Sequence, residues 1–164
     1  MKTLLLLRHA KSSKDDPSLP DFERPLNKRG KEDSKLIGNF IGKKRLTPDV
    51  VLSSPAKRAR QTTELVLKAA GLKLDPIFDE RIYEASPRRL LQVVGEIDDT
   101  ARFAILVGHN PGFEDLFQLL VGKALDLPTA SLASIALRVE KWSNTEPGVG
   151  ILDYLVTPKE LRKS

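Results

Sequence analysis

The sequence contains no cysteine, which excludes disulfide bonds and thiolate chemistry. It is also poor in aromatic side chains that could stack on bases, with six Phe, two Tyr and one Trp, and it has neither zinc-ligand spacing nor an RNA-binding signature. The net charge of +5 therefore fits an acidic or phosphorylated partner at least as well as a nucleic acid. We expect no nucleic-acid partner.

Long apolar runs are missing as well. The longest hold about five residues, whereas a helix that crosses a membrane needs about 20. The chain begins Met1-Lys2-Thr3 and then enters a short apolar run, which does not fit a cleavable signal peptide. We expect no membrane association and a cytoplasmic location. No repeat or low-complexity linker divides the chain, so we interpret residues 1–164 as a single domain.

Short apolar runs alternate with amphipathic segments over most of the chain. Strands are expected at residues 3–8, 49–53, near 72–78 and 103–108. Helices are expected over 27–44, 54–70, from 86 and over 111–121. Alternating residues in 134–141 and 151–156 predict a closing hairpin. This order is typical of an α/β domain, a three-layer sandwich with a mainly parallel sheet and helices on both faces.

Histidine is scarce, and both copies stand directly after an apolar run. Residues 3–7 lead into Arg8 and His9, and residues 104–108 lead into His109. Ligand sites in open α/β sheets gather at the carboxyl ends of parallel strands, so two such ends could bring both imidazoles into one crevice. A third run, 49–54, leads into a segment rich in arginine. Histidines and arginines at one sheet edge suggest a site for a phosphoryl group.

The segment after that third run predicts a helix with cations in its first turns. Lys57, Arg58 and Arg60 lie there, although the positive end of a helix dipole disfavours cations, and a bound anion would remove the conflict. Lys57 fits better as a side chain in water. Arg58 and Arg60 are about 200° apart around a helix, so only one should reach the strand ends. Periodicity does not choose between them.

The second histidine, His109, lies at a different junction between a strand and a helix. Asn110 is expected to cap the helix that follows Pro111, and the backbone N–H groups there could support a phosphate together with His109. An ordinary Asn-Pro turn beside a structural histidine is the alternative.

The residue pair Arg8 and His9 is harder to explain structurally, because adjacent polar groups at the end of a buried strand are costly unless paired. A neutral imidazole can attack phosphorus, and nearby arginines help to keep it neutral. Those arginines would repel a metal cation, and neither histidine has a neighbour at metal-ligand spacing. We therefore expect no metal and no cofactor.

Four segments together resemble the histidine phosphatase superfamily: residues 7–12 (LRHAKS), 24–30 (RPLNKRG), 53–62 (SSPAKRARQT) and 107–111 (VGHNP). The short chain, RHA in place of RHG, and GHNP are most similar to the SixA-like phosphohistidine phosphatases. The resemblance implies the mixed, mostly parallel fold of the phosphoglycerate mutases.

Carried over by position, the resemblance makes His9 the nucleophile that becomes phosphorylated. It implies that Arg8, Arg58 and His109 hold the phosphoryl oxygens, which also selects Arg58 over Arg60. Further substrate contacts are expected at four other positions, namely Arg24, Lys11, Ser12 and Asn110.

The resemblance does not decide which residue protonates the leaving group. Mutases and many ester phosphatases of the superfamily carry an acid in a segment resembling residues 79–83, which nominates Glu80 as a catalytic residue. SixA-type members commonly lack that acid, and a solvated loop carboxylate is the equal alternative.

The sequence thus predicts a metal-independent phosphatase that acts on phosphohistidine in a signalling or phosphotransfer protein. A phosphatase of small phosphorylated molecules is the second hypothesis. The third is a catalytically inactive module that binds phosphopeptides.

Overall fold

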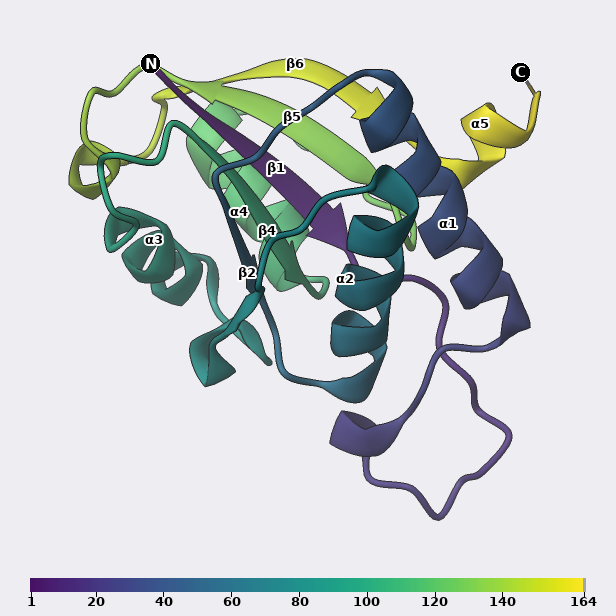
Figure 1. Ribbon diagram of the computed structural model, residues 1–164. Helices are drawn as coiled ribbons and strands as arrows, with labels where there is room; N and C mark the ends of the chain where they lie inside the picture. Colours follow the sequence, from purple (N-terminus) through teal and green to yellow (C-terminus); the bar gives the residue numbers. More distant parts are fainter. Residues whose placement is uncertain (164) are drawn as a thin grey trace.

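A six-stranded sheet forms the centre of the molecule in the computed structural model, which describes residues 1–163 (Figure 1). The strands are β1 (Lys2–Arg8), β2 (Val50–Ser53), β3 (Ile77–Phe78), β4 (Phe103–Gly108), β5 (Leu132–Leu137) and β6 (Gly150–Val156). The helices are α1 (Lys28–Lys43), α2 (Lys57–Ala70), α3 (Pro87–Gly95), α4 (Gly112–Val121) and α5 (Pro158–Lys163).

The strand order in the sheet is β3-β2-β4-β1-β5-β6. The pairs β3–β2, β2–β4 and β4–β1 are parallel, whereas β5 is antiparallel to both β1 and β6. The sheet is therefore mixed and mostly parallel, as expected. The parallel part matters most for function, because its neighbouring strands β2, β4 and β1 all end at the same edge.

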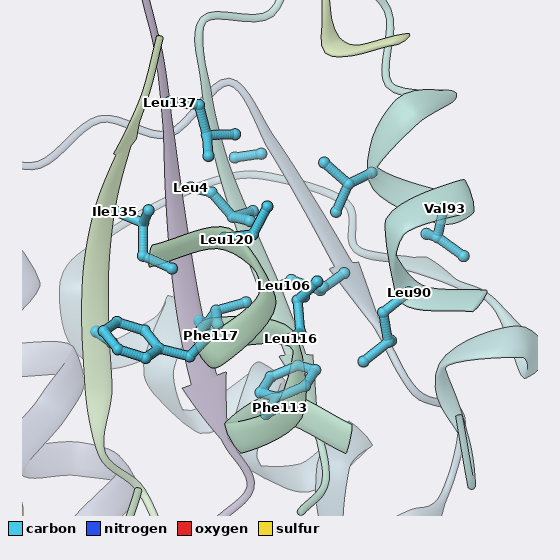
Figure 2. Close-up of a cluster of buried hydrophobic side chains, with 14 of the residues drawn as sticks. Leu4, Leu90, Val93, Leu106, Phe113, Leu116, Phe117, Leu120, Ile135 and Leu137 are labelled. Atoms are coloured by element: carbon cyan, nitrogen blue, oxygen red, sulfur yellow. The ribbon is translucent and has the colours of Figure 1, made fainter. Parts of the chain in front are cut away.

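Helices cover both faces of this sheet and bury two separate apolar cores. Side chains alternate along β1, so Leu4 and Leu6 join one core while Leu5 and Leu7 join the other. Helices α3 and α4 pack on the first face, and α1 and α2 pack on the second. Figure 2 shows the first core, where side chains of α4 lie against the sheet. The three-layer α/β sandwich predicted from the sequence is confirmed.

Local capping interactions set several helix ends. The Asn27 side chain accepts a hydrogen bond from the amide of Gly30 at 2.8 Å and caps α1. Ser86 caps α3 in the same way, with Pro87 as the first helical residue. Gly71 ends α2 with a φ of +71°, a backbone conformation that suits glycine.

Two expectations at helix starts are wrong, namely that a helix begins at residue 54 and that Asn110 caps the helix after Pro111. Helix α2 begins at Lys57, and Ser54 caps no helix, because its hydroxyl lies at the sheet edge beside His109. Helix α4 begins at Gly112 without a side-chain cap, because the Asn110 amide instead donates to the carbonyl of Leu127. In both places the polar side chain turns toward the strand ends.

The C-terminal hairpin is confirmed, but its first strand is shifted. Strand β5 begins at Leu132 and ends at Leu137, rather than covering 134–141. The chain then forms a short 3-10 helix in which Trp142 is fully buried and donates its indole N–H to the carbonyl of Ala101. Burial of the Trp142 side chain favours this short helix over the longer strand that the alternating pattern predicts. Within residues 1–163, no helix is both long and apolar enough to cross a membrane.

Candidate active site

The ends of β1, β2 and β4 bring both histidines together. Arg8 at the end of β1 is in register with Gly108 at the end of β4, so His9 and His109 follow neighbouring strands. Their ring centroids lie 4.9 Å apart, and both residues are buried. The sheet edge thus produces the shared crevice that the sequence suggested.

The tautomer of His9 is fixed by its own backbone. Its Nδ1 lies 2.7 Å from the carbonyl oxygen of Ala10, and because a carbonyl can only accept, Nδ1 carries the ring proton. The amide of Ala10 in turn donates to the Thr62 hydroxyl at 3.0 Å, which holds this segment against α2. The remaining nitrogen, Nε2, therefore has a free lone pair.

Burial lowers the pKa of His9 to about 4. The hydrogen bond to Ala10 opposes this change, while Arg58, Arg8 and Arg24 lower the pKa further. The imidazole is consequently neutral near pH 7, which is the state in which it can act as a nucleophile.

His109 is also held neutral. Burial lowers its pKa to about 3, with smaller contributions from His9 and Arg58. Its Nε2 lies 2.7 Å from the hydroxyl of Ser54, which also accepts a bond from the Ala56 amide. When the hydroxyl proton lies in the bond to Nε2, Nδ1 carries the ring proton.

Two arginines complete this cluster, with Arg58 buried and Arg8 half-buried. Arg8 donates through Nη1 to the carbonyl of Leu127 at 2.9 Å. Arg58 donates through Nη1 and Nη2 to the backbone oxygen and the carboxylate of Asp21, at 2.7 and 3.0 Å. Arg60 turns the other way and stacks on Phe78, 3.9 Å from the ring centroid. Of the two arginines, Arg58 is therefore the one that lies in the cluster, and it is also the one that the resemblance selected.

Three buried nitrogen atoms in this cluster have no hydrogen-bond partner within residues 1–163: Arg8 Nε, Arg58 Nε and His109 Nδ1. An unsatisfied buried donor costs about 1–3 kcal/mol, and charged groups cost more. A group of this kind calls for an explanation, such as a bound ion, a water molecule or a catalytic role. These nitrogens come from three different elements of one sheet edge and suit a tetrahedral oxyanion.

Asp21 is a site residue that sequence reasoning missed. Its carboxylate accepts from Arg58, from Arg24 at 3.2 Å and from the Tyr83 hydroxyl at 2.6 Å. The Tyr83 bond, followed by Arg58 and Arg24, lowers the Asp21 pKa to about 2. Burial and Asp21 raise the pKa of Tyr83 to about 12, which keeps its donor proton in place. Asp21 lies in a polar stretch without periodicity, so no pattern marked it.

A cavity of about 690 Å³ opens beside this cluster. Its walls include Asp21, Arg58, Tyr83, Glu84, His109 and Asn110. Asn110 also keeps one buried oxygen, Oδ1, without a partner within residues 1–163.

The other expected site residues are distributed unevenly. Arg24 is near enough to His9 to lower its pKa. Ser12 forms an isolated backbone bridge with Leu26, and Lys11 lines a separate pocket. Glu80 is exposed and does not line the 690 Å³ cavity. The structure thus brings the two histidines, Arg8, Arg58, Arg24 and Asn110 to one site, and Glu80 lies outside the cavity wall.

Comparison with known proteins agrees with this geometry. The sequence model of the histidine phosphatase superfamily, branch 1, matches residues 4–92. An uncharacterised protein of Mycobacterium tuberculosis is 32% identical over 93% of this chain and 100% of its own length. The chain belongs to the histidine phosphatase superfamily. The matched range contains His9 and Arg58 but ends before His109, whose ring centroid the fold places 4.9 Å from that of His9.

Two solved structures share the fold. A protein of Agrobacterium tumefaciens, provisionally named as the phosphohistidine phosphatase SixA, is 29% identical, with a TM-score of 0.83 over 96% of this chain and 98% of that one. The protein histidine phosphatase SixA in complex with tungstate is 22% identical, with a TM-score of 0.79 over 97% of this chain and 99% of that one. The phosphoglycerate mutase-like fold of the SixA proteins is therefore confirmed for this chain.

The histidine pKa values can be tested directly, because the chain has only two histidines. Both pKa values are lowered, to about 4 and about 3, so both rings lose their protons at a lower pH than the usual 6.5. In an NMR titration of the imidazole resonances, we expect both rings to stay neutral from pH 8 down to about 5. A midpoint near 6.5 for either ring would contradict the buried, arginine-flanked geometry.

Proposed function

We propose that this protein is a metal-independent phosphohistidine phosphatase that works through a phosphorylated His9. The observation that carries the proposal is the free Nε2 of a neutral His9 beside three buried nitrogens without partners. A nucleophile and an oxyanion pocket are the two parts that phosphoryl transfer requires.

In the proposed first step, His9 Nε2 attacks the phosphorus of a phosphohistidine on a partner protein. The new N–P bond forms as the bond to the substrate imidazole breaks, and the leaving nitrogen takes up a proton. Arg8, Arg58 and His109 hold the phosphoryl oxygens, with charge-assisted bonds from the two guanidinium groups. In the second step, water attacks the phosphorus, inorganic phosphate leaves and His9 returns to its neutral state.

The preference for phosphohistidine is supported by the leaving group. An imidazole departs readily once protonated and titrates near neutral pH, so it needs little help from an enzymic acid. Glu80 is exposed outside the cavity wall. The likeness to the two SixA structures supports the same substrate class.

Substitution of His9 tests the proposed nucleophile. His9→Ala should abolish both turnover of a chromogenic aryl phosphate and formation of a phosphoenzyme, while the circular dichroism spectrum stays that of the wild type. Acid-labile label should be trapped on the wild-type protein after an alkaline quench. Label trapped on the His9→Ala protein would mean that another residue is phosphorylated.

The two arginines of α2 provide a matched pair. Arg58→Ala should lower kcat for the aryl phosphate by about 10²-fold or more, as expected when a donor to the transferring group is lost. Arg60→Ala removes the same charge from the same helix but only a stacking contact with Phe78, so kcat should scarcely change. Equal losses in the two variants would overturn the assignment of Arg58.

The acid is tested with two neighbouring carboxylates. Glu80→Gln should scarcely slow dephosphorylation of a phosphohistidine protein, because the imidazole leaves without a strong acid. Glu84→Gln is the variant with which Glu80→Gln is compared, because Glu84 lines the cavity and Glu80 does not. An alkyl phosphate ester needs a positioned acid, which is worth roughly 10²–10⁴-fold.

Both variants are therefore assayed on both substrates. Fast wild-type hydrolysis of a small alkyl ester, lost in Glu80→Gln, together with negligible activity on phosphohistidine would replace the proposal with a phosphatase of small esters.

A further inference from the structure

A second pocket, of about 470 Å³, is strongly cationic, and its lining includes Lys11, which follows His9 by two residues. It is lined by Lys11, Arg29, Lys159 and Arg162, with Asp33 as its one carboxylate within the described residues. These side chains come from the segment after β1, the first turns of α1, and α5.

Most of the positive charge in this pocket is not neutralised by the protein. Asp33 is buried and pairs with Arg162 and, at 3.5 Å, with Arg29. Lys11 and Lys159 form no ion pair with any carboxylate within residues 1–163. The first turn of α1 contains basic residues and no acidic one, which its helix dipole disfavours. An anionic partner would offset both the charge repulsion and the dipole.

The pocket and the active site share their supporting backbone. Lys11 follows His9 by two residues, and Thr129, also in the pocket wall, stands directly before Ala130. The amide of Ala130 donates to the carbonyls of Arg8 and His9, both at 3.1 Å. A chain lying in the pocket would therefore run close to the phosphorylated residue of the same molecule.

The lining of the active-site cavity has the reverse charge. The cavity beside His109 is lined by the carboxylates of Asp21, Glu84 and Asp115, and Arg58 is the one basic side chain among its lining residues. An acidic chain would be repelled there and attracted to the α1–α5 side. The two linings therefore differ in the sign of the partner charge that they favour.

We propose that this cationic pocket is the docking surface for an acidic segment that flanks the phosphohistidine of the partner protein. The inference rests on the proposed function and extends it to the chemistry of the partner. A nucleic acid fits less well, because the lining contains no aromatic side chain on which a base could stack. The pocket's proline and threonine residues suit a peptide backbone instead.

The test uses two synthetic peptides of equal length, each with one histidine phosphorylated by phosphoramidate. Glutamates flank the histidine in one peptide and glutamines in the other. The variants are Arg29→Gln/Lys159→Gln and, as the control, Lys35→Gln/Lys68→Gln, which makes the same charge change at exposed positions of another surface hollow. Asp33 keeps Arg162 as its partner in both proteins.

At low ionic strength the wild type should favour the glutamate peptide by about tenfold in kcat/KM, since complementary charge steers association. The preference should fall to about twofold or less in Arg29→Gln/Lys159→Gln, mainly through KM, and should persist in the control. Equal kcat/KM for both peptides in the wild type, or equal loss in both variants, would overturn the docking surface.

Failure of the proposed function gives a different pattern. An enzyme that hydrolyses an aryl phosphate but neither phosphopeptide is not a phosphohistidine phosphatase. The docking surface is then decided by fluorescence anisotropy with the unphosphorylated glutamate peptide. Binding lost only in Arg29→Gln/Lys159→Gln supports it, and binding unchanged in that variant overturns it. Tighter binding of a single-stranded oligonucleotide, lost in the same variant, would assign the pocket to nucleic acid instead.

Discussion

The hydrogen bond from His9 Nδ1 to the carbonyl of Ala10 is the interaction on which the site depends. It fixes the proton on one ring nitrogen and leaves the other, Nε2, with the free lone pair that the proposed mechanism uses as the nucleophile. The bond is local, but the rest of the fold holds it in place. Register between β1 and β4 sets the position of His9, and Thr62 on α2 fastens the Ala10 amide. A buried sheet edge thereby presents one reactive atom in one protonation state.

Positive charge around His9 Nε2 comes from arginine side chains, whereas the two imidazoles are neutral. Two guanidinium groups and two imidazoles share a buried cluster, and the imidazoles stay neutral because burial and the arginines both lower their pKa values. Asp21 holds the terminal nitrogens of Arg58 and leaves its Nε without a partner. The charge that remains is suited to a dianionic phosphoryl group, which would remove the cost of concentrating cations away from water.

Much of this arrangement could be predicted from the sequence, because strand ends are local features. The apolar runs before Arg8 and His109 predict strands that end at these residues. Because β1 and β4 are parallel neighbours, the two histidines then lie at the same sheet edge. Periodicity could not choose between Arg58 and Arg60, because the choice depends on how α2 is rotated against the sheet. Contacts such as that of Arg60 with Phe78 show this rotation only in the folded structure. Resemblance to a family supplied that choice, and the geometry agrees with it.

Long-range side-chain contacts account for what the sequence did not reveal. Asp21 meets Tyr83 across 62 positions of the chain, and neither residue belongs to a periodic pattern. Ser54 and Asn110 fit helix caps by local rules, yet both turn to partners at the strand ends. At these positions the needs of the site outweigh local propensity.

A crystal structure with vanadate bound would show which atom attacks the phosphoryl group, because vanadate adopts the geometry of a phosphoryl group in transfer. We predict a bond between vanadium and His9 Nε2, with the vanadate oxygens accepting from Arg8 Nε, Arg58 Nε and His109 Nδ1. Vanadate bound away from His9 Nε2, for example in the pocket of Lys11 and Lys159, with those three nitrogens left without partners, would contradict it.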